Sequence, residues 1–140
     1  MAFLLDTNFV SECRKKLKAD KGVIAWQNQT PREKQFISVI TLLEIKMGVR
    51  MAKDRKFAQI LQTWYDKQII PYFSGRILDI DISVAEARSA LKTTRTIPAY
   101  DALLAATAFS HNFVLVTRNI ADFKDTGVSV LNPWITDTQS

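Results

Sequence analysis

The chain has 140 residues, of which 47% are hydrophobic and 24% charged, and its 19 Lys and Arg against 14 Asp and Glu give a net charge of +5. With only 4 glycines and 4 prolines, this composition is typical of a globular domain and excludes collagen-like, low-complexity and coiled-coil proteins. The single cysteine, Cys13, cannot form an intramolecular disulfide, which favours a reducing compartment.

No apolar run approaches the ~20 residues of a membrane span. The first residues carry no basic segment and reach Asp6 too early for a signal peptide. We therefore expect a cytoplasmic protein without a membrane partner. Residues 1–134 are expected to form one domain, followed by a polar tail over residues 135–140.

Short runs of β-branched and aromatic residues alternate with helical patterns. The expected strands cover residues 2–5, 36–40, 77–82, 113–117 and 128–131. An apolar stripe from Phe57 to Tyr65 has helical spacing, and this helix is expected to end at Pro71. A second helix over residues 98–109 begins with proline and carries alanines that allow close packing on a sheet. Strands separated by helices imply an α/β fold with a mainly parallel sheet of about five strands.

Four acidic side chains stand where a parallel sheet binds ligands. They are Asp6, Glu44, Asp101 and Asp122. Three of them follow predicted strands, whose carboxyl ends meet at one edge of the sheet, and Asp101 lies in the first turn of a helix that can point to the same edge. Four converging acids repel one another unless a cation neutralises them. Oxygen ligands without a His or Cys cluster favour Mg²⁺ or Mn²⁺ over zinc.

Each acidic residue taken alone also has a simple structural interpretation. Asp6 suits the N-cap of the following helix. Thr41 and Glu44, three residues apart, have the form of a capping box. Asp101 complements a helix dipole, and Asp122 suits a turn. Their joint occurrence at strand ends favours a shared site.

The basic residues form one cluster over residues 14–21 and another over residues 46–56. A solvated helix face explains each cluster on its own. Beside an acidic metal site, however, they suit the cleavage of a phosphodiester. The metal polarises the phosphate and activates water, while Lys and Arg bind the flanking backbone.

Four ordered motifs cover much of the chain. They are residues 4–8 (LLDTN), 38–45 (SVITLLEI), 97–108 (IPAYDALLAATA) and 115–123 (LVTRNIADF). Together they resemble the motifs of PIN-domain ribonucleases, and most of all those of VapC and FitB-like toxins of bacterial toxin–antitoxin pairs. Residues 73–78 (FSGRIL) and 132–134 (NPW) are similar to the FitB-like branch.

The resemblance implies a three-layer α/β/α sandwich and a Mg²⁺-dependent endoribonuclease, in which Mn²⁺ can substitute and metal-activated water hydrolyses RNA. It implies that Asp6, Glu44 and Asp101 are catalytic residues and metal ligands. The family has a further acidic or amide position after the fourth strand. This chain has Asn119 where the FitB-like branch has an acid, and Asp122 follows three residues later.

We assign Asp122 as the fourth catalytic and metal-binding residue and keep Asn119 as the alternative, in a supporting role. Thr117 and Asn8 resemble polar positions that support the acids in the family. Hydrogen bonding at a strand end and in a turn explains these two residues equally well.

The resemblance also implies partners. These are an RNA substrate, a second copy of the chain in a homodimer with one basic groove, and an antitoxin of the VapB or FitA type that inserts a basic side chain into the cleft. One alternative is a catalytically silent nucleic-acid-binding module of the same fold. A more remote one is a phosphate-receiver signalling domain, which would need an acid pair where Asp6 is followed by Thr7.

Three other residues are predicted to be structural. Cys13 is expected to pack in an early helix, because no base accompanies it as a nucleophile would need. His111 is expected at a helix C-terminus. Asp81 is expected to cap a helix that begins near Ser83.

Overall fold

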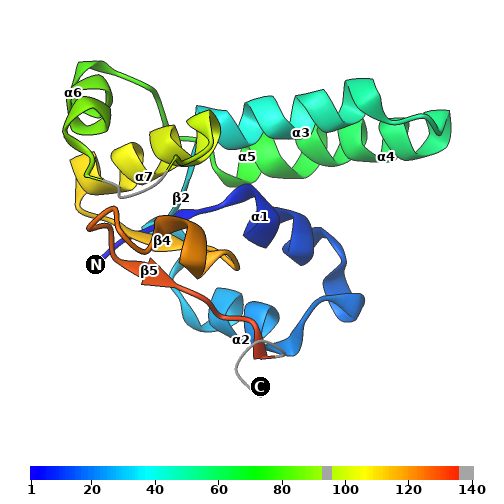
Figure 1. Ribbon diagram of the computed structural model, residues 1–140. Helices are drawn as coiled ribbons and strands as arrows, with labels where there is room; N and C mark the ends of the chain where they lie inside the picture. Colours follow the sequence, from blue (N-terminus) through cyan, green and yellow to red (C-terminus); the bar gives the residue numbers. More distant parts are fainter. Residues whose placement is uncertain (93–95, 136–140) are drawn as a thin grey trace.

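The computed structural model describes residues 1–92 and 96–135 (Figure 1). Five strands form one sheet: β1 (Phe3–Leu5), β2 (Gln35–Ser38), β3 (Ile77–Leu78), β4 (Val114–Val116) and β5 (Val130–Leu131). Their order is β3-β2-β1-β4-β5, and every pair is parallel. The predicted parallel sheet is therefore confirmed. The strand order reverses between β1 and β4, and in open parallel sheets the crevice outside the carboxyl ends of two such strands is where ligands bind.

Helices connect the strands and cover the sheet. They are α1 (Thr7–Arg14), α2 (Lys21–Gln29), α3 (Val39–Met51), α4 (Arg55–Trp64), α5 (Ile70–Tyr72), α6 (Ile82–Ala90) and α7 (Ala99–His111). Short helical turns add η1 (Lys16–Lys18), η2 (Arg32–Lys34), η3 (Tyr65–Ile69) and η4 (Ile120–Phe123). In the described residues, none of these helices has both the length and the apolar composition needed to span a membrane. The helices α3 and α4 lie side by side as an arm that extends beyond the sheet (Figure 1).

The two faces of the sheet carry separate cores. Successive side chains of a strand point to opposite faces. On one face, Leu5 packs with Phe9 of α1 and Val23 of α2. On the other, Leu4 packs with Leu104 of α7. This arrangement is the expected three-layer sandwich. The polar tail was expected over residues 135–140, and residues 136–140 lie outside the described part of the chain.

The junction of β2 and α3 differs from the sequence prediction. The strand ends at Ser38, whose hydroxyl oxygen accepts the N–H of Ile40 at 3.0 Å and so caps α3. The alternative interpretation of Thr41 and Glu44 as a capping box does not hold, because both residues already lie inside the helix. Their side chains are therefore available for contacts outside α3.

The strand expected over residues 77–82 contains only Ile77 and Leu78. It pairs with β2 alone, and β2 ends at Ser38, so residues beyond Leu78 have no neighbouring strand. Asp81 instead accepts the N–H of Val84 at 3.0 Å and caps α6, as expected. The helix begins one residue before the predicted position.

The helical segment that begins at Arg55 extends to Tyr72, one residue past its predicted end at Pro71. After Trp64 the chain widens into the π-helical turn η3, in which the N–H of Ile70 bonds the carbonyl of Tyr65. Pro71 then lies inside α5. A proline lacks an N–H and clashes with the carbonyl four residues before it, and a wider turn relieves both conflicts.

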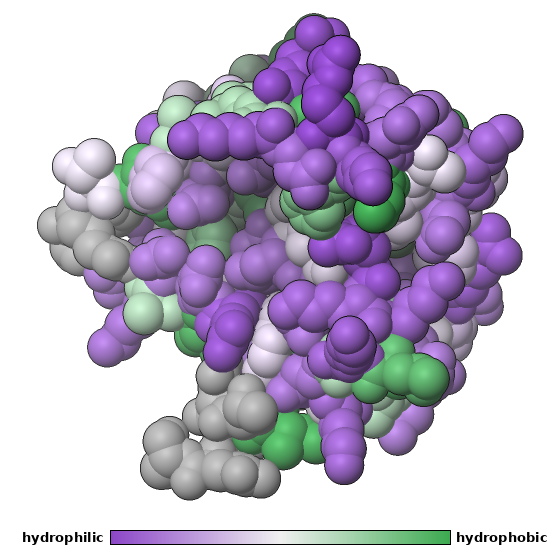
Figure 2. All heavy atoms as spheres, turned by 90° about the vertical axis from the view of Figure 1, so that its right-hand side faces the viewer, coloured by the Kyte–Doolittle hydropathy of each residue, from purple (hydrophilic) through white to green (hydrophobic). Residues whose placement is uncertain are grey.

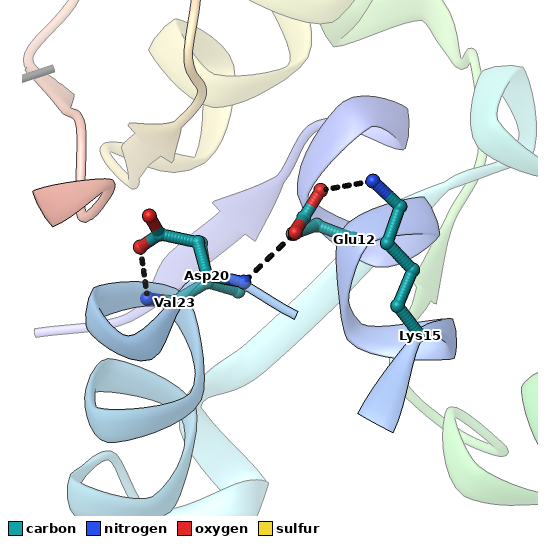
Figure 3. A network of polar contacts seen from close by, with 4 residues as sticks. All are labelled: Glu12, Lys15, Asp20 and Val23. Carbon is teal, nitrogen blue, oxygen red and sulfur yellow. Dashed lines mark hydrogen bonds and ion pairs between the residues drawn. The ribbon is translucent and has the colours of Figure 1, made fainter. Parts of the chain in front are cut away.

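A polar network fixes the connection between α1 and α2 (Figure 3). The Glu12 carboxylate accepts a hydrogen bond from Lys15 Nζ at 2.9 Å and another from the N–H of Asp20 at 2.8 Å. Burial raises the pKa of Glu12, but these two donors outweigh burial and hold it below its usual value. Asp20 in turn accepts the N–H of Val23 and caps α2.

Gly22 stands where α2 meets the end of the described chain. A Cβ at Gly22 would lie 2.1 Å from the carbonyl oxygen of Pro133, so no side chain fits. We expect Gly22→Ala to lower the free energy of unfolding by about 1–3 kcal/mol, as overpacking commonly does.

The matched control is Gly48→Ala. Gly48 lies inside α3, and the atom nearest to an added Cβ is Leu61 Cδ1 of α4, at 4.0 Å. The exchange should therefore raise the free energy of unfolding by about 1 kcal/mol. Urea unfolding of both variants measures the two effects. Equal changes in the two variants would contradict the close approach at Gly22.

Candidate functional site

Asp6 stands in the crevice between the ends of β1 and β4. Its backbone N–H bonds the carbonyl of Val116 at 2.9 Å, which continues the pairing of the two strands. Its carboxylate accepts the N–H of Thr7 at 2.7 Å and the hydroxyl of Thr117 at 2.8 Å. The side chain therefore caps α1, as the structural interpretation predicted, and also faces the crevice with only 8% of the residue exposed.

Thr117, which follows β4, is hydrogen-bonded to Asp6, which follows β1. It is fully buried, donates its hydroxyl hydrogen to Asp6, and accepts the N–H of Asn119 at 3.1 Å. The side-chain amide of Asn8 lies 3.4 Å from the same hydroxyl oxygen. Thr117 and Asn8 were expected to support the acids, and in the structure they contact each other beside Asp6.

Glu44 reaches the site from α3 and meets two threonines. The hydroxyl oxygen of Thr7 lies 2.6 Å from Glu44 Oε1 and 3.0 Å from the hydroxyl of the buried Thr41. A carboxylate only accepts, so Thr7 donates to Glu44 and accepts from Thr41. Both threonines lie in the quoted motifs, but no local pattern predicts their contact with each other or the contact of Thr7 with Glu44. Thr7 is adjacent to Asp6, but its partner is 37 positions away.

Asp101 lies in the first turn of α7 and is half-buried. Burial raises the pKa of its carboxyl, and the negative charges of Asp6 and Asp122 raise it further. The N-terminus of α7 thus brings Asp101 into electrostatic contact with acids from two other elements. This agrees with the prediction that the helix points to the same edge of the sheet.

Asp122 belongs to the turn η4, whose orientation is set by its neighbour. Phe123 is 1% exposed and packs in the core beneath the turn, and the N–H of Asp122 bonds the carbonyl of Asn119 at 3.1 Å. The charge of Asp122 contributes to the raised pKa values of both Asp6 and Asp101. Asn119 is exposed and contributes its backbone N–H to Thr117.

The electrostatics of Asp6 define the chemistry of the site. Burial is the largest cause of its raised pKa, and hydrogen bonds from Thr117 and Thr7 only partly offset it. The negative charges of Glu44 and Asp122 raise the pKa further. Asp6 is therefore coupled electrostatically to Glu44 and Asp122, and Asp101 to Asp6 and Asp122.

No group of three or more acidic, His or Cys side chains in residues 1–92 and 96–135 is arranged to enclose a metal ion. The chemistry of the donors nevertheless fits a hard divalent cation, since buried carboxylates that repel one another are stabilised by it. Glu44 is coupled electrostatically to Asp6, and Thr7 holds its carboxylate at the start of α1.

Two reactive side chains take no part in the site. Cys13 packs against the core, and burial, with a smaller effect of Glu12, raises the pKa of its thiol to about 12. A thiol of that pKa is a poor nucleophile, which agrees with its predicted structural role. His111 ends α7, also as predicted, and its ring lies 5.4 Å from that of Phe113.

The chain is similar to one protein named as a toxin and one named as a ribonuclease over nearly its whole length. It is 36% identical to toxin FitB of Neisseria gonorrhoeae over 136 residues, which cover 94% of this chain and 97% of FitB. It is 32% identical to VapC ribonuclease Y4jK of Sinorhizobium fredii, also over 136 residues, which cover 94% of this chain and 96% of that protein.

Solved structures agree with these relatives. The crystal structure of FitAcB from Neisseria gonorrhoeae superposes with a TM-score of 0.86 at 33% identity, covering 95% of this chain and 99% of that one. A toxin–antitoxin complex from Klebsiella pneumoniae gives 0.69 at 27% identity, covering 96% and 98%. The model of the PIN domain matches residues 3–128. With its parallel sheet, its acidic crevice and this match, the chain belongs to the PIN-domain family.

Proposed function

We propose that this protein is a metal-dependent endoribonuclease and the toxin of a toxin–antitoxin pair. The observation that carries the proposal is the buried carboxylate of Asp6, whose pKa is raised by burial and by two neighbouring acids. A buried carboxylate that lies near other acids is costly, and a divalent cation offsets that cost. The ribonuclease and toxin names of two relatives that match almost the full length support the same activity.

In this proposal the carboxylates of Asp6, Glu44, Asp101 and Asp122 would hold Mg²⁺, or Mn²⁺ in its place. The bound metal would supply the positive charge that polarises a phosphodiester and activates water. Thr117 keeps the Asp6 carboxylate facing the crevice, and Thr7 keeps Glu44 at the start of α1. Asn8 and the N–H of Asn119 both donate to the Thr117 hydroxyl oxygen and so hold it beside Asp6.

A cleavage assay on a labelled single-stranded RNA tests this proposal. We expect fragments with Mg²⁺ or Mn²⁺, none with excess EDTA, and recovery when Mg²⁺ is restored. Binding of the same RNA without cleavage under every metal condition would instead support the catalytically silent nucleic-acid-binding module. Cleavage that persists in EDTA would contradict the metal-dependent mechanism.

An antitoxin is the proposed protein partner. Inhibition would come from an Arg or Lys side chain that enters the crevice and pairs with the acids, where several charge-assisted hydrogen bonds are available. The solved toxin–antitoxin complex with the same fold supports such an assembly. The antitoxin should block cleavage and weaken Mn²⁺ binding together, and inhibition with unchanged Mn²⁺ affinity would exclude this mode.

A homodimer is the proposed assembly of the toxin itself. Leu43 and Met47 of α3 and Tyr100 of α7 are each about two-fifths exposed, and the Tyr100 hydroxyl lies 3.9 Å from Met47 Sδ. Adjacent exposed apolar side chains on two helices are typical of a subunit interface. Light scattering at micromolar concentration should give about twice the chain mass of 15.9 kDa. A mass equal to one chain would contradict the dimer.

A further inference from the structure

A hollow outside the acidic crevice is lined by positive charge. It lies between the end of α1 and the helix α4 and has a volume of about 470 Å³. Its polar lining consists of Arg14, Lys16, Lys56, Gln59, Thr63 and Gln68, and contains no acidic residue. We call it the basic hollow. Figure 2 views this side of the molecule and shows mostly hydrophilic residues, with the hydrophobic ones in separate patches.

The three cations of the basic hollow have no acidic partner among the residues that the structure describes. Arg14, Lys16 and Lys56 form no ion pair with any residue of the described ranges. The guanidinium carbon of Arg14 lies 5.4 Å from the ring centre of Phe57 and 6.0 Å from that of Trp64. Such stacking occupies the face of the guanidinium and leaves its in-plane N–H groups as donors. The hollow can therefore bind an anion.

The backbone of Lys16 sets the position of its side chain at the end of α1. Its φ of +54° is in the left-handed region, which favours glycine and disfavours lysine. The network of Figure 3 holds this turn, because Glu12 binds both Lys15 Nζ and the N–H of Asp20 on either side of it. A left-handed residue just after the C-cap is a common way for a helix to end, and here it fixes the direction in which the chain leaves α1 beside the hollow.

We propose that the basic hollow binds the phosphodiester backbone of the RNA substrate, several nucleotides from the bond that is cleaved. This inference rests on the proposed ribonuclease function. Asp6 caps the start of α1, and Arg14 is its last residue. Eight residues of helix span about 12 Å, so a strand whose reacting phosphate lies at the acids can follow α1 to the hollow.

The position of the hollow at the far end of α1 from Asp6 favours RNA over an acidic peptide as the occupant. Amide and hydroxyl donors from Gln59, Thr63 and Gln68 accompany the cations, and phosphate oxygens accept from both kinds of group. Phosphates also repeat along a strand, so one molecule can occupy the crevice and the hollow together. The role of the hollow is thus to position the substrate and to supply affinity, with no part in bond cleavage.

The test compares two double variants with the same change in charge. Lys16→Asn with Lys56→Gln removes two cations from the hollow, whereas Lys34→Gln with Lys92→Gln removes two exposed lysines that do not line it. Fluorescence anisotropy of a fluorescein-labelled 15-nucleotide single-stranded RNA in EDTA measures binding without cleavage. We expect the hollow variant to bind about 10-fold more weakly, and the control less than about 2-fold, because two phosphate contacts are lost.

Two further readouts separate a local role from a general one. The slope of log affinity against log salt should become shallower by about 1.4 in the hollow variant, at ~0.7 per phosphate contact. Its melting temperature should not fall, because asparagine adopts the left-handed conformation more readily than lysine. Equal loss of RNA affinity in both double variants would overturn the proposal, since only the total charge would then matter.

The competing occupant is tested with poly-L-glutamate as the probe. If the hollow variant loses affinity for poly-L-glutamate but keeps its affinity for RNA, the hollow binds an acidic peptide and the proposal is wrong. Failure of the wild-type protein to cleave RNA with Mg²⁺ would refute the proposed ribonuclease function. The anisotropy comparison would still decide whether the hollow binds RNA, so the two failures are distinguishable.

Discussion

Asp101→Asn should reduce metal-dependent RNA cleavage by about 100-fold or more while the fold is retained. Loss of groups that only support metal ligands already costs 10–100-fold, and this exchange removes a charge from the proposed ligand set itself. Asparagine has nearly the size of aspartate and is compatible with the first turn of a helix. The rate of cleavage at saturating Mg²⁺ is the measurement, and undiminished turnover would remove Asp101 from the site.

The same variant should be more stable than the wild-type protein at neutral pH without metal. The pKa of Asp101 is raised in the folded state, by burial first and then by the charges of Asp6 and Asp122, so its ionised form disfavours folding. As the pH falls through the raised pKa the wild-type protein recovers this stability, and below the unfolded value the two proteins should converge. Melting curves in EDTA from pH 7 down to about pH 3.8 follow the convergence.

Asp79→Asn is the matched control for both effects. Asp79 is exposed and lies just beyond β3, at the edge of the sheet farthest from β5. It should change neither the cleavage rate nor the melting temperature. A drop in cleavage as large as that of Asp101→Asn would mean that total negative charge, and no particular carboxylate, controls activity.

The placement of Asp6, Asp101 and Asp122 could be predicted because each depends on a local pattern. A strand end followed by a helix start sets the position of Asp6, and the parallel sheet then brings the later strand ends to the same edge. Phe123 is buried and draws the Asp122 turn against the core. The burial of a phenylalanine can be expected from the residue type alone. For these residues, the local sequence pattern and the order of the strands predict the same position at the edge of the sheet.

Other features depend on partners far apart in the chain, and no local pattern contains them. The bond between Thr7 and Glu44 joins residues 37 positions apart. The β-branched residues over 36–41 fit a strand and a helix equally well, and only the capping bond of Ser38 decides where one ends. Pro71 predicts a helix end, but the π-helical turn before it absorbs the proline. Sequence patterns therefore give the acids more reliably than the side chains that orient them.

Asp122→Ala should raise the Mg²⁺ concentration needed for half-maximal activity and reduce cleavage at low Mg²⁺ by about 10–100-fold. The charge of Asp122 reaches both Asp6 and Asp101, so its loss removes a negative group from the place where a metal would bind. Buried Phe123 remains to hold the turn, and the fold should persist. Asp122→Asn, which keeps the size of the side chain, should show the same raised requirement if charge is the cause.

Asn119→Ala should have a smaller effect, because the contact of Asn119 with Thr117 is made by its backbone N–H and survives the exchange. Titration of activity against Mg²⁺ compares the two alanine variants directly. The rise in melting temperature on Mn²⁺ addition gives a second readout that does not depend on turnover, since a ligand stabilises the state that binds it. Asp122→Ala should reduce that rise and Asn119→Ala should leave most of it.

A raised metal requirement in Asn119→Ala with none in Asp122→Ala would assign the fourth position to Asn119. In that case the site would bind one ion firmly, and the substrate phosphate would have to supply the oxygen ligands for a second.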